Sequence, residues 1–309
     1  MHTEIFHTLV AIMAMVSLFL FSLQGFSKQL QKYSSESIKN WLGRVTKNKI
    51  LGLLLGAGLT ALIQSSSAVS SIVVALVDSG IISFYNSLSI LLGTNIGTTF
   101  TAWLITFNIQ NLGPILLVVG TIIGFLPWKI NFAGKSIFYL GLILFSLQLI
   151  SNSLEPIKNS EAILEVLKYS SNKYLAVFIG MILTALLQSS SVTTGLALVL
   201  TIQGLLTLEA AIGIVVGCNI GTTSTAFMAA YKLGKTAKIT AQANFIFNLI
   251  GLVIFFPFLS VFTNLIGKID AEIGIQVATA HLIFNVSVAL ITFPFLNKIG
   301  RLIEQRNAN

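Results

Sequence analysis

The chain has 309 residues, of which 55% are hydrophobic and only 9% are charged, whereas a soluble domain usually carries about a quarter charged residues. Together with a mean hydropathy of +0.89, the long apolar runs predict an all-α polytopic membrane protein. The net charge of +8 is then explained by Lys and Arg that flank membrane spans, so nucleic acid is not an expected partner. The single cysteine, Cys218, excludes an intrachain disulfide and a paired-thiol metal site.

One sequence unit occurs twice. Gln64–Ser67 reads Gln-Ser-Ser-Ser, and the same four residues return 124 positions later at Gln188–Ser191. The same offset links two further pairs, Asn95–Thr99 with Asn219–Thr223 and Leu20–Gln24 with Leu144–Gln148. The chain is therefore predicted to consist of two transmembrane repeats, 1–128 and 129–309, the second of which includes additional C-terminal helices.

The first repeat is predicted to begin with an apolar span at 5–27 and a basic surface helix at 28–49. The next element, about 50–80, is apolar on both sides of Gln64–Ser67. Its first half, Leu51–Ile63, has about 13 residues, too few to cross a hydrocarbon core of about 30 Å at 1.5 Å per residue. We therefore expect a re-entrant hairpin of two half-helices with the polar residues at its tip. A serine-rich face for helix packing is the alternative.

Residues 83–107 are predicted to form a discontinuous transmembrane helix. Gly93 can end the first half, because glycine tolerates the left-handed conformation. Thr98 or Thr99 can cap the second half by accepting from unpaired N–H groups. Close packing of small residues at Gly93 and Gly97 is the alternative, but it leaves the asparagine and threonines of this stretch unexplained.

A short span at 113–128 ends the first repeat, and the second follows the same order. Its predicted elements are a span at 131–153, a polar linker at 154–174, a re-entrant hairpin at about 174–204 and a broken helix at about 208–231. Two last spans, about 239–263 and 275–297, share a shorter repeated pattern, Asn244–Asn248 and His281–Asn285. The asparagines of this shorter pattern could join helix to helix or could reach the site.

The orientation of the repeats follows from counting. A hairpin returns to its own side, so the first repeat makes three crossings and the second starts from the opposite face, which gives two inverted-topology repeats. Seven crossings in total place the termini on opposite sides. Of the 18 Lys and Arg residues, 14 fall on the side of the C-terminus. The positive-inside rule then predicts an external N-terminus and a cytoplasmic C-terminus in a bacterial plasma (inner) membrane.

Helix breaks near the midplane suit an anion and a cation together. Free N–H groups at a helix N-terminus attract an anion, unpaired carbonyls at a C-terminus attract Na⁺, and Ser or Thr hydroxyls serve both. Inverted repeats with such breaks are typical of secondary transporters. Because no Lys or Arg lies near either tip in the sequence, we expect neutral donors to hold the anion and a cation to enter with it. The nearest acids, Asp78 and Glu209, lie at far ends of these elements, which favours Na⁺ over H⁺.

Both Gln-Ser-Ser-Ser motifs are followed by Gly-Thr-Asn-Ile-Gly-Thr-Thr or Gly-Cys-Asn-Ile-Gly-Thr-Thr. This doubled pattern resembles the type II sodium-dependent phosphate cotransporter family over most of residues 17–231. The resemblance implies Na⁺-coupled transport of inorganic phosphate by alternating access, with a hairpin-bearing unit moving against a scaffold.

The resemblance also implies which residues bind the ions. Phosphate and Na⁺ would share two sets of side chains, Gln64, Ser65, Ser66, Ser67, Asn95, Thr98 and Thr99 in the first repeat and Gln188, Ser189, Ser190, Ser191, Asn219, Thr222 and Thr223 in the second. Na⁺ would also use backbone carbonyls, and no other cofactor and no transition metal is expected. Phosphate, Na⁺ and membrane lipid are the expected partners, and a homodimer is left open.

Two alternatives stand beside this interpretation. A Na⁺-coupled carrier of another anion, sulfate or a dicarboxylate, would use similar small polar tips. An intramembrane serine hydrolase would need a base beside its nucleophile. The three histidines are His2, His7 and His281, and the sequence has no Gly-x-Ser-x-Gly elbow. The sequence therefore argues against an enzyme.

Overall fold

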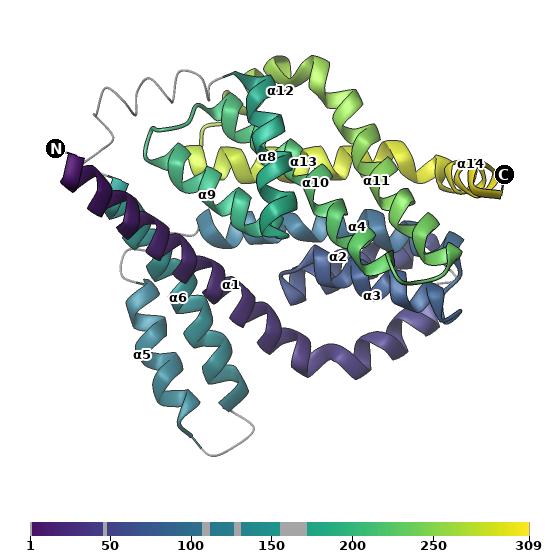
Figure 1. Cartoon of the computed structure of the whole chain (residues 1–309), viewed down its shortest axis with the longest axis horizontal. Coiled ribbons are helices and arrows are strands. Elements are labelled where there is room, and N and C mark those ends of the chain that lie inside the picture. Colours follow the sequence, from purple (N-terminus) through teal and green to yellow (C-terminus); the bar gives the residue numbers. More distant parts are fainter. Residues whose placement is uncertain (1, 46–47, 107–111, 127–130, 155–171, 309) are drawn as a thin grey trace.

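The computed structural model describes residues 2–45, 48–106, 112–126, 131–154 and 172–308, and every regular element in these ranges is a helix (Figure 1). The predicted all-α class is thereby confirmed. Six helical segments of the described chain are long and apolar enough to cross a membrane, namely Val10–Lys32, Phe84–Thr106, Asn131–Leu154, Leu208–Ala230, Lys235–Ile266 and Ile273–Asn307.

The repeat in the sequence is also a repeat in the helices. Three helices each have a counterpart of equal length 124 positions later, α2 (Lys49–Ile63) with α8 (Lys173–Leu187), α3 (Ser66–Asp78) with α9 (Ser190–Ile202) and α4 (Phe84–Thr106) with α10 (Leu208–Ala230). The side chains of Asn48 and Asn172 accept hydrogen bonds from N–H groups in the first turns of α2 and α8. The same local signal thus begins both copies.

Each Gln-Ser-Ser-Ser motif is a helix break, as the half-helices predicted for this stretch require. Gln64 and Gln188 end α2 and α8 in the left-handed conformation, with φ of 58° and 53°, and among the described residues they are the only non-glycines with positive φ. Ser65 and Ser189 follow with extended backbone and begin α3 and α9. A left-handed residue commonly ends a helix. One helix C-terminus and one helix N-terminus therefore meet at each motif.

The second predicted break is wrong, because α4 and α10 are continuous helices. The Thr98 hydroxyl donates to the carbonyl oxygen of Thr94 at 2.8 Å, and the Thr99 hydroxyl donates to that of Ile96 at 2.7 Å. The corresponding threonines of α10 do the same. Such hydrogen bonds satisfy the hydroxyls inside an unbroken helix, so these threonines cap nothing.

The glycines of the same stretch bring two helices together. A Cβ at Gly93 would lie 2.0 Å from the carbonyl oxygen of Leu53, and one at Gly97 would lie 2.3 Å from that of Ala57. Matching contacts hold α10 against α8. Close approach of backbones at small residues is how membrane helices associate. The packing alternative is therefore confirmed for these glycines.

The first long helix extends further than predicted. α1 (His2–Val45) continues through the boundary expected near residue 28. Figure 1 shows it crossing beside the hairpin of α5 (Leu112–Gly124) and α6 (Asn131–Leu154), and it packs on α6 and also contacts α2 and α9. α5 has 13 residues, about 20 Å of helix, so it is shorter than the six spans. Most of the linker predicted at 154–174 lies outside the described residues.

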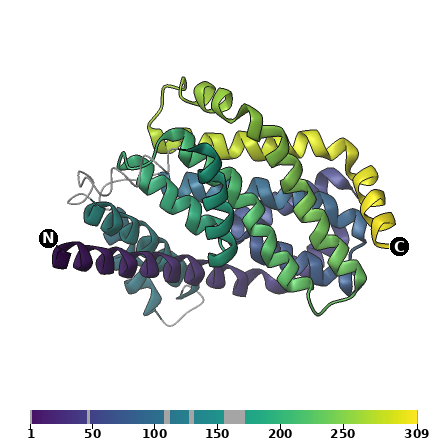
Figure 2. The same ribbon diagram turned by 45° about the horizontal axis from the view of Figure 1, so that its top comes forward.

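The C-terminal helices form a smaller repeat of their own. α11 (Lys235–Phe255) leads into α12 (Leu259–Ile266), and α13 (Ile273–Thr292) leads into α14 (Leu296–Ala308), each through a Phe-Pro-Phe 3₁₀ turn. Proline has no N–H to donate, which explains the local change of helix type. Figures 1 and 2 place the start of α1 and the end of α14 at opposite ends of the molecule.

We predict that Gly93→Ala destabilises the protein. The new methyl group would overlap the Leu53 carbonyl, and overpacking of this kind costs about 1–3 kcal/mol. Gly58→Ala is the matched control, because a Cβ there meets nothing within 4 Å and alanine favours a helix by up to about 1 kcal/mol. Thermal unfolding in detergent should show a lower midpoint for Gly93→Ala only. Equal midpoints would contradict the packing role.

Candidate functional site

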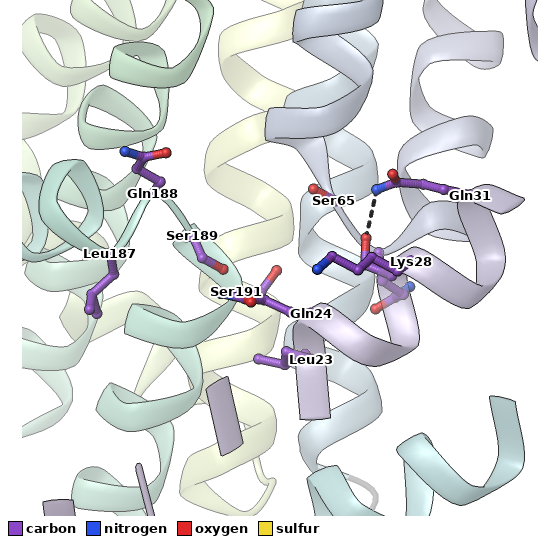
Figure 3. Close-up of a pocket in the computed structure, with 11 residues that line it drawn as sticks. Leu23, Gln24, Lys28, Gln31, Ser65, Leu187, Gln188, Ser189 and Ser191 are labelled. Atoms are coloured by element: carbon purple, nitrogen blue, oxygen red, sulfur yellow. Dashed lines mark hydrogen bonds between the residues drawn. The ribbon is translucent and has the colours of Figure 1, made fainter. Parts of the chain in front are cut away.

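A cavity of about 310 Å³ lies where the two Gln-Ser-Ser-Ser tips face α1 (Figure 3). Since one water occupies about 30 Å³ in the liquid, this space fits a small anion with several waters. Residues of α1 and of the two tips line it, namely Leu23, Gln24, Ser27, Lys28, Gln31, Gln64, Ser65, Leu187, Gln188, Ser189 and Ser191. We call this space the tip cavity.

The structure brings the two motifs together although 121 residues separate the groups that touch. The Ser67 hydroxyl donates to the backbone carbonyl oxygen of Gln188 at 3.3 Å. Five motif residues line the tip cavity directly. Ser66 and Ser190 are buried as the first residues of α3 and α9. The predicted tip residues thus share one location.

The two glutamines have different surroundings. Gln64 is buried, its side-chain nitrogen donates to the carbonyl oxygen of Ala61, and its side-chain oxygen accepts from Thr101 at 3.0 Å. Gln188 is exposed and lines the tip cavity. The same residue is therefore fixed by neighbours in one repeat and accessible to a ligand in the other.

Thr101 connects the two tips and was not predicted. Its hydroxyl donates to Gln64 and accepts from the Ser191 hydroxyl at 3.3 Å. Thr101 lies two residues after Asn95–Thr99, and Thr225 occupies the same place in the second repeat. Extending the comparison of the two motifs by two residues shows that this threonine is repeated, but not that Thr101 contacts both tips.

The six residues predicted on α4 and α10 are absent from the lining of the tip cavity. The threonine hydroxyls return to their own helices, as described above. Asn95 donates to the side-chain oxygen of Asn248 at 3.0 Å, and Asn219 donates to that of Asn285. These asparagines therefore attach α11 to α4 and α13 to α10, so in this structure the shorter repeated pattern joins helix to helix.

The tip cavity is lined by a lysine side chain that we did not expect there from the sequence. Lys28 lines the cavity, and Figure 3 shows its side chain reaching from α1 toward the space between the tips. No acidic residue is among the described residues that line the cavity. The expectation of a site without Lys or Arg is therefore wrong. Lys28 lies 36 residues before Gln64, and only the path of α1 brings it to the tips.

A second cavity of about 220 Å³ lies between α6 and the far end of α9. Gln148, Ser151 and Asn152 line it from α6, and Gln203 lines it from the residue that follows α9. The side-chain amide of Gln203 donates to the Ser151 hydroxyl at 2.5 Å. We call this space the α6 cavity.

The family model described as Na⁺/Pi-cotransporter matches the chain twice, at residues 18–152 and 151–283. The chain belongs to this family. Each match contains one Gln-Ser-Ser-Ser motif, and the resemblance inferred from the motifs is confirmed. Together with the six apolar spans, membership identifies an integral membrane protein of a transporter family, which indicates that it is not an enzyme.

Three relatives illustrate the range of the similarity. The Bacillus subtilis (strain 168) "Uncharacterized protein YqeW" is 33% identical over 87% of this chain and 89% of its own length. The Escherichia coli (strain K12) "Putative inorganic phosphate export protein YjbB" is 27% identical over 85% of this chain, which spans about half (49%) of that protein. The Bos taurus "Sodium-dependent phosphate transport protein 2B" is 38% identical over 27% of this chain and 13% of its own length. No solved structure matches the chain.

We predict that Thr101→Val destabilises the protein more than Thr225→Val. The first change leaves the buried side-chain oxygen of Gln64 without its donor, and an unsatisfied buried group costs about 1–3 kcal/mol. The Thr225 hydroxyl donates only to the carbonyl of Thr222 in its own helix, so its loss should cost little. Thermal unfolding of both variants in detergent measures the difference. Equal losses would show that Thr101 does not hold the tips together.

Proposed function

We propose that the protein is a secondary active transporter that couples movement of inorganic phosphate to Na⁺, with both ions bound between the two tips. The observation that carries this proposal is the meeting of the two Gln-Ser-Ser-Ser breaks in one polar cavity beside Lys28. Membership in the Na⁺/Pi-cotransporter family supports the choice of ions.

The helix ends at the tips supply groups for an anion. Ser65 caps α3 by accepting from the N–H of Ala68 at 3.2 Å, whereas the Ser189 side chain makes no capping bond to α9. The first turn of α9 therefore has an extra N–H group to offer, and the helix dipole favours negative charge there. Hydroxyls such as that of Ser191 and the amide of Gln188 can add neutral donors.

The same tips supply oxygens for Na⁺. α2 and α8 end at Gln64 and Gln188, where the last carbonyls of a helix have no partner inside it. Serine hydroxyls lie beside these carbonyls and can also act as ligands. Entry of Na⁺ with phosphate would lower the net charge that crosses the membrane. All fourteen tip and helix residues named from the sequence remain our proposed set, and those at the tips are the ones closest to the cavity.

We further propose that the repeats 1–128 and 129–309 are inverted in a bacterial plasma membrane. α2 and α3 would form a re-entrant hairpin from the cytoplasmic side, and α8 and α9 would form one from outside. α2 has 15 residues, about 22 Å of helix, which suits entry to the midplane and return. The opposite ends occupied by the termini (Figure 2) support an odd number of crossings. Alternating access would then move the repeats against each other.

A carrier of sulfate or a dicarboxylate is the alternative, because neutral donors and one ammonium do not by themselves select phosphate. Purified protein in liposomes decides between them. We predict that an inward Na⁺ gradient drives uptake of labelled phosphate, that a K⁺ gradient does not, and that sulfate and succinate compete weakly. Uptake of succinate without uptake of phosphate would overturn the proposal.

The same assay tests the site. Gln188→Ala should raise the KM for phosphate about tenfold, because a hydrogen bond to a charged group contributes about 1.5–3 kcal/mol. Its thermal stability should stay unchanged, since Gln188 is exposed. Gln305→Ala is the matched control, because Gln305 is exposed and lines neither cavity. A wild-type KM in Gln188→Ala would remove Gln188 from the site.

The proposed orientation is tested by cysteine labelling in intact cells. Cys218 is buried, so the wild-type chain should react little with a membrane-impermeant thiol reagent. We predict labelling from outside for Thr3→Cys and none for Ala308→Cys until the cells are opened. The reverse pattern would invert the proposed topology.

A further inference from the structure

Four residues of α1 line the tip cavity, whereas the four residues at the corresponding positions of α6, 124 residues later, line the other cavity, the α6 cavity. The pairs are Leu23 with Leu147, Gln24 with Gln148, Ser27 with Ser151, and Lys28 with Asn152. Three of the four pairs are identical. The fourth differs by a positive charge.

Under the proposed function, this difference in surroundings would correspond to one of two access states. Three helix pairs, α2 with α8, α3 with α9 and α4 with α10, have equal bounds, so each repeat has a frame that could accommodate the surroundings of the other. Exchange of the two arrangements gives a second state of similar packing, as alternating access between repeats requires. In that state α6 would bring Gln148, Ser151 and Asn152 to the tips.

The exchanged state also gives Lys28 a new neighbour. The α6 cavity is lined by Ile202 and Gln203 at the far end of α9, and the matching positions of the first repeat are Asp78 and Ser79. Lys28 would then lie near the Asp78 carboxylate. In the present structure Asp78 instead accepts a hydrogen bond from the backbone N–H of Gly234 at 2.8 Å. An acid at this position would stabilise the lysine after it leaves the tips.

We propose that Lys28 gives the ion site a positive charge in one access state, and that Asn152 replaces it in the other. This inference rests on the proposed function and adds a difference between the two faces of the membrane. An ammonium group forms stronger, charge-assisted hydrogen bonds with an oxyanion than an amide does. Phosphate therefore binds more tightly in the state in which Lys28 lies at the tips, and it is released more readily in the state in which Asn152 lies there.

The test measures half-saturating phosphate concentrations separately at the two membrane faces, in liposomes where all molecules share one orientation. Wild-type protein should show a lower value at one face. Lys28→Asn should raise the value about tenfold at that face and leave the other unchanged, whereas Lys28→Arg should keep it within about twofold. Lys32→Asn is the matched control, because Lys32 lies one turn further along α1 and does not line the cavity.

The reciprocal variant separates a charge effect from a structural one. Asn152→Lys should lower the half-saturating concentration about tenfold at the opposite face. Combined with Lys28→Asn, it should exchange the half-saturating concentrations of the two faces. The inference would be overturned if the wild type transports phosphate and both single variants keep the wild-type half-saturating concentrations at both faces. If Lys28→Asn fails to fold, Asn152→Lys alone decides. Absence of phosphate transport by the wild type would instead overturn the proposed function.

A second experiment does not depend on transport. α3 has 13 residues, so about 20 Å of helix separates the tip cavity from Asp78. A Lys28→Cys, Asp78→Cys pair should therefore form a disulfide only through the exchanged state, with little background because Cys218 is buried. Excess phosphate with Na⁺ should slow formation of the disulfide, because it stabilises the state in which residue 28 lies at the tips. A pair that never cross-links would refute the exchange of neighbours.

Discussion

The structure depends on two points where a helix stops inside apolar surroundings. At Gln64 and Gln188 the backbone turns left-handed, and the last carbonyls of one helix and the first N–H groups of the next lose their intrahelical partners. In a hydrocarbon environment such groups are tolerated only where protein encloses them or water reaches them. The two breaks meet that requirement together, because the Ser67 hydroxyl of one tip donates to the Gln188 carbonyl of the other, and Thr101 of α4 accepts from Ser191 and donates to Gln64.

The unbroken helices α4 and α10 are the supports that make these breaks tolerable. Their glycines let α2 and α8 pack at backbone distance, and Thr101 of α4 bonds to residues of both tips. The C-terminal helices reinforce each support through an asparagine pair. Packing on α4 and α10 thus fixes the positions of the polar groups at the tips, which are the groups that we propose as ligands.

The helices α2, α3 and α4 have the same bounds as α8, α9 and α10, but the contacts of the two repeats differ. Gln64 is buried and bonded where Gln188 is exposed, and α1 faces the tips where α6 faces the far end of α9. If the two repeats exchange these surroundings, as we propose, the molecule has a second arrangement available. This property is what a transporter that alternates between two faces needs, and it links the fold to the function that we propose.

The sequence by itself determined the features that local chemistry controls. The offset of 124 residues defined the repeats, the short apolar runs around each Gln-Ser-Ser-Ser motif indicated a helix break, and the doubled motif indicated the family. The continuity of α4 was missed because a threonine hydroxyl can cap a helix or bond back within one, and only packing against α2 decides between them. Lys28 and Thr101 were missed for a related reason. Their role comes from distances between segments far apart in the chain, and only the tertiary path of α1 and α4 brings them to the tips.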